Sequence, residues 1–164
     1  MTKAMENNLL EQVYNYEKAV YQNTQQEQKR IMAVAVHFEI PAMPTEIFEI
    51  LYKFLNQDAK TKITKDSSTG QVFIRKFNNQ TLHYVLTKNH YTKEIELATF
   101  IDMNLFKINF DLIKVNNVNS EIVYTESWRW PTALKIKYRQ KKLFKQKVKD
   151  KGYEIKTSIF EQLK

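Results

Sequence analysis

The 164-residue sequence predicts a single α+β domain built on an antiparallel sheet, and three observations lead to that prediction. Strand patterns follow one another without an intervening helix from Gln71 to Trp130. One strand and one helix precede them, and residues 132–164 carry the longest helical pattern in the chain. Strands kept apart from helices are typical of α+β folds, whereas alternating strands and helices favour a parallel sheet. Each strand has one apolar face, so we expect one cover for the sheet, and only the last helix is long enough to provide it.

Residues 6–30 are predicted to form a helix that frays into a linker near Thr24–Lys29. Four apolar residues of this segment recur at helical spacing on one face: Leu9, Val13, Tyr16 and Val20. Such a face is typical of a docking or dimerisation arm, which would make a homodimer. It is also typical of an extension that lies against its own domain, and we prefer this second interpretation. We place this N-terminal helical extension at 1–31 and the main domain at 32–164.

Ile31–Ile40 alternates apolar and polar residues, the period of a half-buried strand. Prolines follow directly and end the strand, because proline cannot donate to a sheet ladder. Pro44–Leu55 has the apolar spacing of an amphipathic helix, with Thr45 as its expected N-cap. Residues 56–70 are polar and rich in turn formers, so we expect a loop closed by Gly70.

Five further strands are predicted from alternating apolar residues: Val72–Phe77, Leu82–Leu86, Glu94–Ile101, Phe106–Leu112 and Glu121–Trp130. Asn78-Asn79 is a hairpin signal, because asparagine tolerates the left-handed conformation that a tight turn needs. With the first strand, these segments make a sheet of about six strands.

Composition excludes several kinds of chemistry. The chain has no cysteine, which excludes disulfides, thiol catalysis and thiolate zinc sites. Its two glycines lie far apart, which excludes glycine-rich phosphate loops. None of the three histidines has a helical partner for a metal, and His37 and His83 are predicted to be exposed. We therefore expect no cofactor and no metal. No apolar run approaches the roughly 20 residues of a membrane span, and the N-terminus lacks a secretory pattern, so we expect a cytoplasmic protein.

Glu126 is the candidate polar residue of the interior. By alternation its side chain points the same way as Tyr124 and Trp128, toward the core. A buried carboxylate must be hydrogen-bonded or neutralised, and Tyr84 or Tyr124 could be its partner. It is either a polar anchor in an apolar ligand cavity, or it lies at the cavity mouth and meets water or a lysine of the last helix. A hydrolase or cyclase that uses Glu126 and a tyrosine is the least favoured interpretation.

The last segment combines an apolar stripe with the net charge of the protein. Residues 132–164 hold 11 Lys/Arg and 3 acids, which accounts for the whole net charge of +8. The stripe comprises Leu134, Tyr138, Phe144, Val148, Ile155, Ile159 and Leu163. Gly152 lies on it, although a helix-interior glycine costs roughly 1 kcal/mol relative to alanine. We expect either a close approach to the sheet, or room for a ligand, or a helix break at Lys151-Gly152.

The lysines of this segment have three interpretations. We favour a solvated outer face, then an anionic membrane or ligand, then nucleic acid. Nucleic-acid binding ranks last because the segment has one arginine and no exposed aromatic run is expected.

The order of elements resembles the helix-grip superfamily, which includes START lipid-transfer domains and the birch-pollen allergen. The similarity lies in the strand AVAVHFEIP, the helix PTEIFEIL, the hairpins from Gln71 to Trp130 and the long C-terminal helix, and it covers residues 32–164. The chain resembles in particular an uncharacterised family of low-GC Gram-positive bacteria. The resemblance implies a curved sheet wrapped around the last helix, with a cavity between them. Members bind lipids, sterols, plant hormones or polyketides, and a few are enzymes, so the fold does not determine the function.

We therefore expect a non-catalytic binding protein that holds a small apolar or amphipathic ligand between the sheet and the last helix. The alternative is an interaction protein with a filled core, which binds a macromolecule or an anionic membrane surface through its N-terminal or basic C-terminal helix. The residues expected to line the ligand site are Phe38, Tyr84, Leu97, Phe106, Ile108, Phe110, Tyr124, Glu126, Trp128, Phe144, Val148, Gly152, Ile155 and Ile159.

Overall fold

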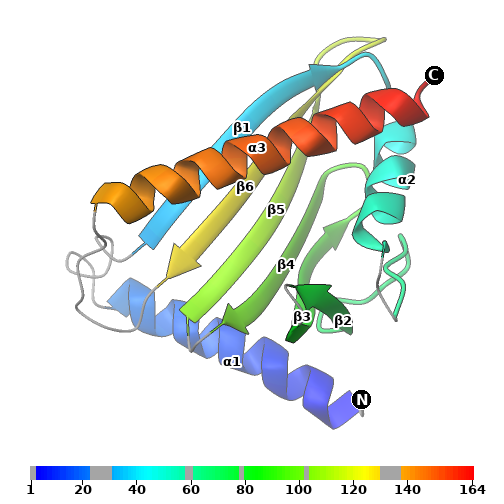
Figure 1. The fold of residues 1–164 in the computed structure, drawn as a ribbon. Coiled ribbons are helices and arrows are strands. Elements are labelled where there is room, and N and C mark those ends of the chain that lie inside the picture. The colour runs from blue at the N-terminus through cyan, green and yellow to red at the C-terminus, as the bar shows by residue number, and fades with distance from the viewer. Residues whose placement is uncertain (1–2, 23–30, 58–60, 78–79, 102–103, 130–137) are drawn as a thin grey trace.

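A computed structural model describes residues 3–22, 31–57, 61–77, 80–101, 104–129 and 138–164 (Figure 1). Its helices are α1 (Lys3–Gln22), α2 (Pro44–Leu55) and α3 (Tyr138–Gln162). Its strands are β1 (Ile31–Ile40), β2 (Val72–Phe77), β3 (Gln80–His90), β4 (Glu94–Ile101), β5 (Asn104–Lys114) and β6 (Ser120–Arg129). The predicted α+β class and the order of elements are confirmed.

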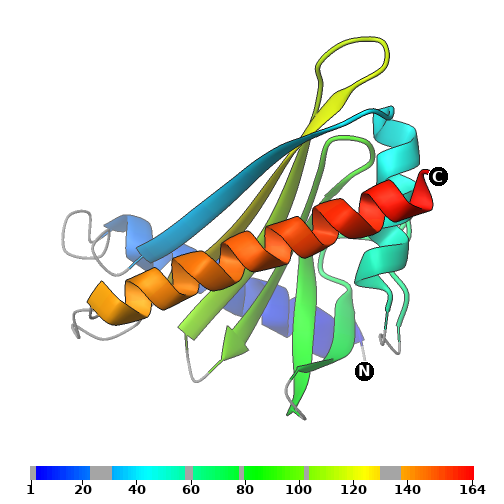
Figure 2. The ribbon, with the colours of Figure 1, turned by 45° about the horizontal axis from the view of Figure 1, so that its top comes forward.

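The six strands form one antiparallel sheet in the order β1-β6-β5-β4-β3-β2. Only β1 leaves the sequential order, because it pairs with β6 and so lies next to the last strand. The sheet curves, and α3 crosses its concave side with α2 at one end (Figures 1 and 2). This is the predicted wrapping of the sheet around the C-terminal helix. We call the side that faces α3 the inner face and the opposite side the outer face.

The main core lies between the inner face and the two helices α2 and α3. The helix α2 contributes a row of fully buried residues that includes Ile47, Phe48 and Leu51. It begins with Pro44 at its first position and Met43 as N-cap, so the expectation that Thr45 caps the helix is wrong. Proline suits the first position because the N–H that it lacks would have no helical acceptor there.

The outer face has a cover of its own, which corrects the prediction of a single cover. Val13 of α1 is fully buried in a small cluster with three outward-facing strand residues: Val85, Ala98 and Leu105. Residues 95–99 of β4 are accordingly all buried, which places this strand between two layers. The preferred interpretation of the N-terminal helix, an extension against its own domain, is confirmed for α1. Thr24–Lys29 and the side chain of Val20 lie outside the described residues, and the domain boundary at residue 31 stays a prediction.

Charged groups hold α1 to the outer face beside this cluster. The ammonium of Lys107 on β5 pairs with Glu17 of α1, and it lies 3.1 Å from Oε1 of Glu96 on β4. Thr87 and Asn109 donate hydrogen bonds of 2.8 and 2.9 Å to the same Glu96 carboxylate. Burial and the charge of Arg129 lower the pKa of Lys107 to about 8. At neutral pH the ammonium is still mostly charged, so it can pair with both carboxylates.

The helix α3 runs without interruption through Gly152, so the predicted break there is wrong. A Cβ at Gly152 would lie 2.9 Å from the Val36 side chain of β1, which shows a close approach of helix and strand. The space beside this glycine is therefore filled by Val36. Tyr138 is 81% exposed and does not belong to the buried stripe. It precedes Val148 by ten residues, which places it about 80° away around the helix. Leu134 lies outside the described residues.

Two connections were predicted from their turn residues. Gly70 closes its loop with a φ of 98°, and its N–H donates to the carbonyl of Leu86, as a turn glycine should. The ladder pairs Phe77 with Gln80, but the predicted Asn78-Asn79 turn lies outside the described residues, as does Trp130. No described helix is both long and apolar enough to cross a membrane.

Candidate functional site

All fourteen predicted lining residues lie between the inner face and α3, and they divide by exposure. Ten are buried: Phe38, Tyr84, Leu97, Phe106, Phe110, Tyr124, Val148, Gly152, Ile155 and Ile159. Four are partly exposed: Ile108, Glu126, Trp128 and Phe144. The register explains why they meet, because β6 pairs Tyr124 with both Val36 and Phe110, and Glu126 with both Val34 and Ile108.

The inner side of β6 becomes more exposed from one end of the strand to the other. On β6, Ile122 and Tyr124 are 0% and 2% exposed, whereas Glu126 and Trp128 are partly exposed. On the neighbouring strands, Val34 and Val36 of β1 and Ile108 of β5 are partly exposed as well, whereas Phe106, opposite Trp128, is 7% exposed. We call the partly exposed set Val34, Ile108, Glu126, Trp128 and Phe144 the mouth. The mouth is the part of the interior that solvent reaches.

Aromatic rings form much of the wall at the mouth. The ring of Trp128 lies 4.6 Å from that of Phe106, centroid to centroid, and 6.5 Å from that of Phe144 on α3. Farther in, the rings of Phe110 and Tyr124 are 5.1 Å apart. The helix and the sheet thus touch through Trp128 and Phe144, where a flat apolar group would find aromatic surfaces.

Glu126 and Tyr124 form the polar pair of this interior. The Tyr124 hydroxyl donates a 2.6 Å hydrogen bond to Oε2 of Glu126. Burial raises the pKa of Glu126, while this hydrogen bond and the charge of Lys151 on α3 act in the opposite direction. Burial, followed by the Glu126 charge, also raises the pKa of Tyr124. The predicted tyrosine partner is Tyr124, and a lysine of the last helix, Lys151, influences Glu126 through its charge.

Arg75 is an interior group that the sequence reasoning missed. Its guanidinium carbon lies 6.0 Å from the ring centre of Tyr84, on the strand next to it. Burial raises the pKa of Tyr84, the charge of Arg75 lowers it, and Glu126 raises it again. The signal was present in the sequence, since Arg75 shares the strand parity of Phe73, which is 1% exposed.

The histidines take no part in this site. His37 and His83 are exposed, as predicted, and Nδ1 of His37 lies 3.0 Å from a carboxylate oxygen of Glu121. Within the described ranges, no three His, Asp or Glu side chains are arranged to hold a metal ion.

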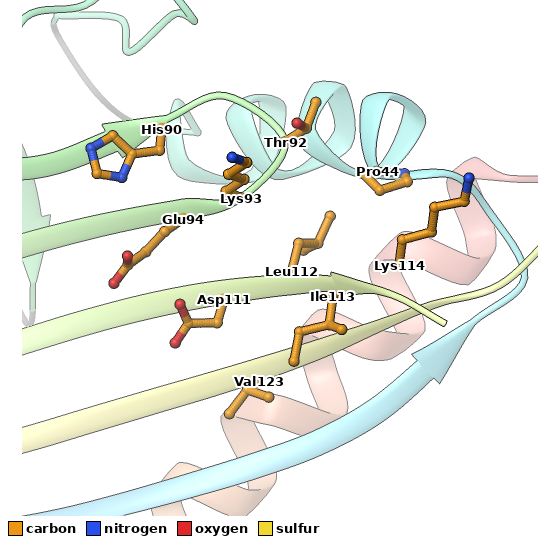
Figure 3. A pocket seen from close by; sticks show the side chains of 10 residues that line it. All are labelled: Pro44, His90, Thr92, Lys93, Glu94, Asp111, Leu112, Ile113, Lys114 and Val123. Carbon is orange, nitrogen blue, oxygen red and sulfur yellow. The ribbon is translucent and has the colours of Figure 1, made fainter. Parts of the chain in front are cut away.

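An open groove lies away from the mouth, at the end of the sheet where β3 turns into β4 (Figure 3). Its volume is about 740 Å³, and it is lined by Pro44, His90, Thr92, Lys93, Glu94, Asp111, Leu112, Ile113, Lys114 and Val123. Glu94 and Asp111 are paired across neighbouring strands, and burial together with Glu94 raises the pKa of Asp111. Lys88 and Asn109 bind Glu94 at 3.1 and 2.8 Å, so side chains of the protein already compensate this carboxylate.

Comparison with solved structures identifies the fold. No protein-family model and no curated protein matches the sequence. Protein MLL2253 from Mesorhizobium loti superposes with a TM-score of 0.59 at 10% identity, over 80% of this chain and 96% of that chain. The Aha1 dimer from Colwellia psychrerythraea gives 0.53 at 18% identity, over 78% and 92%. A norcoclaurine synthase from Thalictrum flavum, solved as a point mutant with a transition-state analogue, gives 0.51 at 10% identity, over 82% and 97%.

These neighbours have helix-grip folds like that of the birch-pollen allergen, so the predicted fold is confirmed. At these identities the likeness extends to the fold alone. One neighbour is an enzyme and another a dimer, which shows that proteins of one architecture differ in what they do.

Proposed function

We propose that this protein is a non-catalytic binding protein that holds a small apolar or amphipathic ligand between the sheet and α3. The observation that supports this proposal is the mouth, where aromatic and aliphatic side chains are partly exposed around one hydrogen-bonded carboxyl group. Small-molecule sites are usually apolar with a few well-placed polar groups, which is the arrangement found here.

The chemistry of the mouth favours a ligand with an uncharged polar end. Partial burial raises the pKa of Glu126, so a negative charge at this carboxyl group is less favourable than it would be in water. A protonated carboxyl group can both donate and accept hydrogen bonds, whereas a carboxylate only accepts. We expect the apolar part of the ligand to lie against Trp128 and Phe144, with its hydroxyl, carbonyl or amide group at Glu126.

Two measurements test the proposal. Native mass spectrometry of protein isolated from its own host should show a co-purified small molecule. The purified protein should also bind the neutral apolar dye Nile red, and Ile108→Trp should weaken this binding because the larger side chain fills the mouth. Val115→Trp is the matched control, since Val115 directly follows the same strand, is 50% exposed and lines neither the mouth nor the open groove.

A clean apo mass together with dye binding that Ile108→Trp leaves unchanged would overturn the proposal. The interior would then be a filled core, as in the alternative of an interaction protein. In that alternative a homodimer through α1 would have to use the side of the helix away from Val13, where Tyr14 is 48% exposed. The oligomeric state in solution, measured by light scattering, tests this idea separately.

Three broader expectations belong to the same proposal. We place the chain with an uncharacterised helix-grip family of low-GC Gram-positive bacteria, on the resemblance of residues 32–164. We expect it to act in the cytoplasm, in keeping with the absence of cysteine from its sequence. The mouth binds its ligand without transforming it, and Glu126→Gln tests this point, because any turnover of a ligand should then be lost if Glu126 were an acid or base.

A further inference from the structure

One flank of α3 carries a row of basic and aromatic side chains. Tyr138, Lys142, Lys145, Lys149 and Tyr153 follow one another at spacings of four, three, four and four residues, which places them on one side of the helix. All five are exposed, and the two tyrosines at the ends of the row are 81% and 70% exposed. The two tyrosines are separate exposed aromatic residues and do not form the aromatic run that the sequence analysis did not expect.

The contacts of α3 show which way this row faces. Gly152 touches Val36 and marks the side of the helix that packs on the sheet. Lys151 lies with its ammonium 5.3 Å from the ring centre of Phe54, which marks the side toward α2. At 100° per residue, the row is centred about 160° from Lys151 and about 60° from Gly152, so it flanks the packed side of the helix, away from α2. The row is therefore open to a partner while α3 stays packed on the sheet.

The first half of α3 carries positive charge only. The twelve residues from Tyr138 to Lys149 contain six Lys/Arg and no acid. Arg139, Lys141 and Lys142 lie in the first turns of α3, where the helix dipole favours acids and disfavours cations. These cations oppose the stability of the helix that carries them, so their placement is better explained by an anionic partner than by the needs of the helix.

We propose that this flank of α3 attaches the protein to the surface of an anionic lipid bilayer. Each lysine near such a surface strengthens attachment about fivefold at low salt. The terminal tyrosines are suited to the interface, because the ring is apolar while the hydroxyl group remains in contact with water. The proposal goes beyond ligand binding and does not depend on it, since the row and the mouth are on different sides of α3.

A nucleic acid fits the same flank less well. Proteins that hold single strands combine a basic groove with aromatic side chains that stack on successive bases. Here the surface is one convex helix, and Tyr138 and Tyr153 are 15 residues apart, which is about 22 Å along the helix axis. Successive bases could not stack on both rings.

Vesicle sedimentation with the full-length protein tests the proposal. We expect binding to vesicles that contain phosphatidylserine, little binding to phosphatidylcholine alone, and weaker binding as salt is added. The triple variant Lys142→Gln, Lys145→Gln, Lys149→Gln should bind about a hundredfold more weakly at low salt. The matched control removes the same charge elsewhere, with exposed lysines of α2, the β3–β4 turn and β5 replaced: Lys53→Gln, Lys93→Gln and Lys114→Gln.

The control should retain most of the binding, and both triple variants should keep the circular dichroism of the parent. Tyr138→Ser with Tyr153→Ser should weaken binding while leaving its salt dependence unchanged, because these changes remove no charge. Equal losses in the two triple variants would mean that only the total charge matters and would overturn the proposal. It would also be overturned if phosphatidylserine vesicles were not bound, or if an oligonucleotide were bound in their place.

Discussion

The two faces of the sheet are each covered by a helix, but different forces hold the two helices. On the inner face, α3 packs through apolar residues and a glycine that brings its backbone against Val36. On the outer face, α1 contributes one fully buried apolar residue, Val13, and is held by the ion pairs that join Glu17, Lys107 and Glu96. Apolar packing therefore holds the inner cover, whereas the outer cover combines a small apolar cluster with buried ion pairs.

This difference bears on function. Apolar contacts have no fixed direction, so the inner face can leave a mouth beside Trp128 and still form a stable core. Buried charges must find their partners, so the outer face has no comparable freedom around Lys107. We infer that a ligand belongs to the inner face, and that α1 serves to close the outer one. Four substitutions test this contrast, from the largest expected effect to the smallest.

Lys107→Met should lower the free energy of unfolding by about 3 kcal/mol, because it leaves the carboxylates of Glu17 and Glu96 without their cation. Urea denaturation at neutral pH measures this loss. Lys88→Met is the matched control. Lys88 likewise pairs with two carboxylates, those of Glu94 and Glu96, but its side chain is 45% exposed. An exposed pair contributes at most about 1 kcal/mol. Equal losses for the two lysines would mean that charge does not hold the outer cover.

Gly152→Val should cost about 2 kcal/mol, because the new side chain would overlap Val36 and force α3 away from β1. In a Val36→Ala background the same change should cost less, and the difference between the two costs measures the contact. Tyr153→Val, at an exposed neighbouring position, should change stability by less than about 0.5 kcal/mol. If Gly152→Val has no effect, α3 can move away from the sheet, and the space beside Gly152 becomes available to a ligand.

Val13→Ala should cost about 1.5 kcal/mol, since it removes two buried methyl groups from the cluster under α1. Thermal unfolding followed by circular dichroism checks the loss, with Asn15→Ala on the exposed side of the helix as the control. A single shifted transition would show that α1 unfolds with the sheet. A separate early transition would instead support the predicted division between residues 1–31 and 32–164.

Glu126→Gln should have the smallest effect, seen as a change in pH dependence. The folded state raises the pKa of Glu126, so it binds the proton more tightly than the unfolded chain does. The stability that this gives is complete below the ordinary carboxyl pKa and is lost as the pH rises through the raised value. The variant cannot ionise, so it should gain stability relative to the parent as the pH rises from acid to neutral. A variant that lost stability relative to the parent over the same rise in pH would contradict the raised pKa.

Local patterns in the sequence were enough to predict most of the fold. Alternation along Ile31–Ile40 and Phe106–Leu112 identified strands and their inner faces, because a side chain in a strand points to the face that its parity dictates. The same parity placed Tyr124 and Glu126 together inside the domain. The predicted ends of α2, Pro44 and Leu55, agree with the structure because proline and the apolar spacing are both local signals.

The errors arose where a feature depends on elements distant in the sequence. Ala98 and Val85 appeared to belong to a solvent-facing side, and only the position of α1 shows that they are buried. Arg75 was not singled out in the sequence, and it is the pairing of β2 with β3 that places it diagonally opposite Tyr84. Tyr138 was assigned to the buried stripe, whereas the first buried residue of α3 is Val148.

Spacing within one segment was therefore enough to predict the strands and helices, the inward set of side chains and a tyrosine partner for Glu126, with Tyr84 and Tyr124 left as alternatives. Only the tertiary structure decided the second cover on the outer face, the close approach at Gly152 and the rise in exposure toward Trp128. It also decided which side of α3 carries its basic row into solvent. The physical reason is that burial and contact are properties of pairs of elements, and the relative placement of two elements is set by the whole fold.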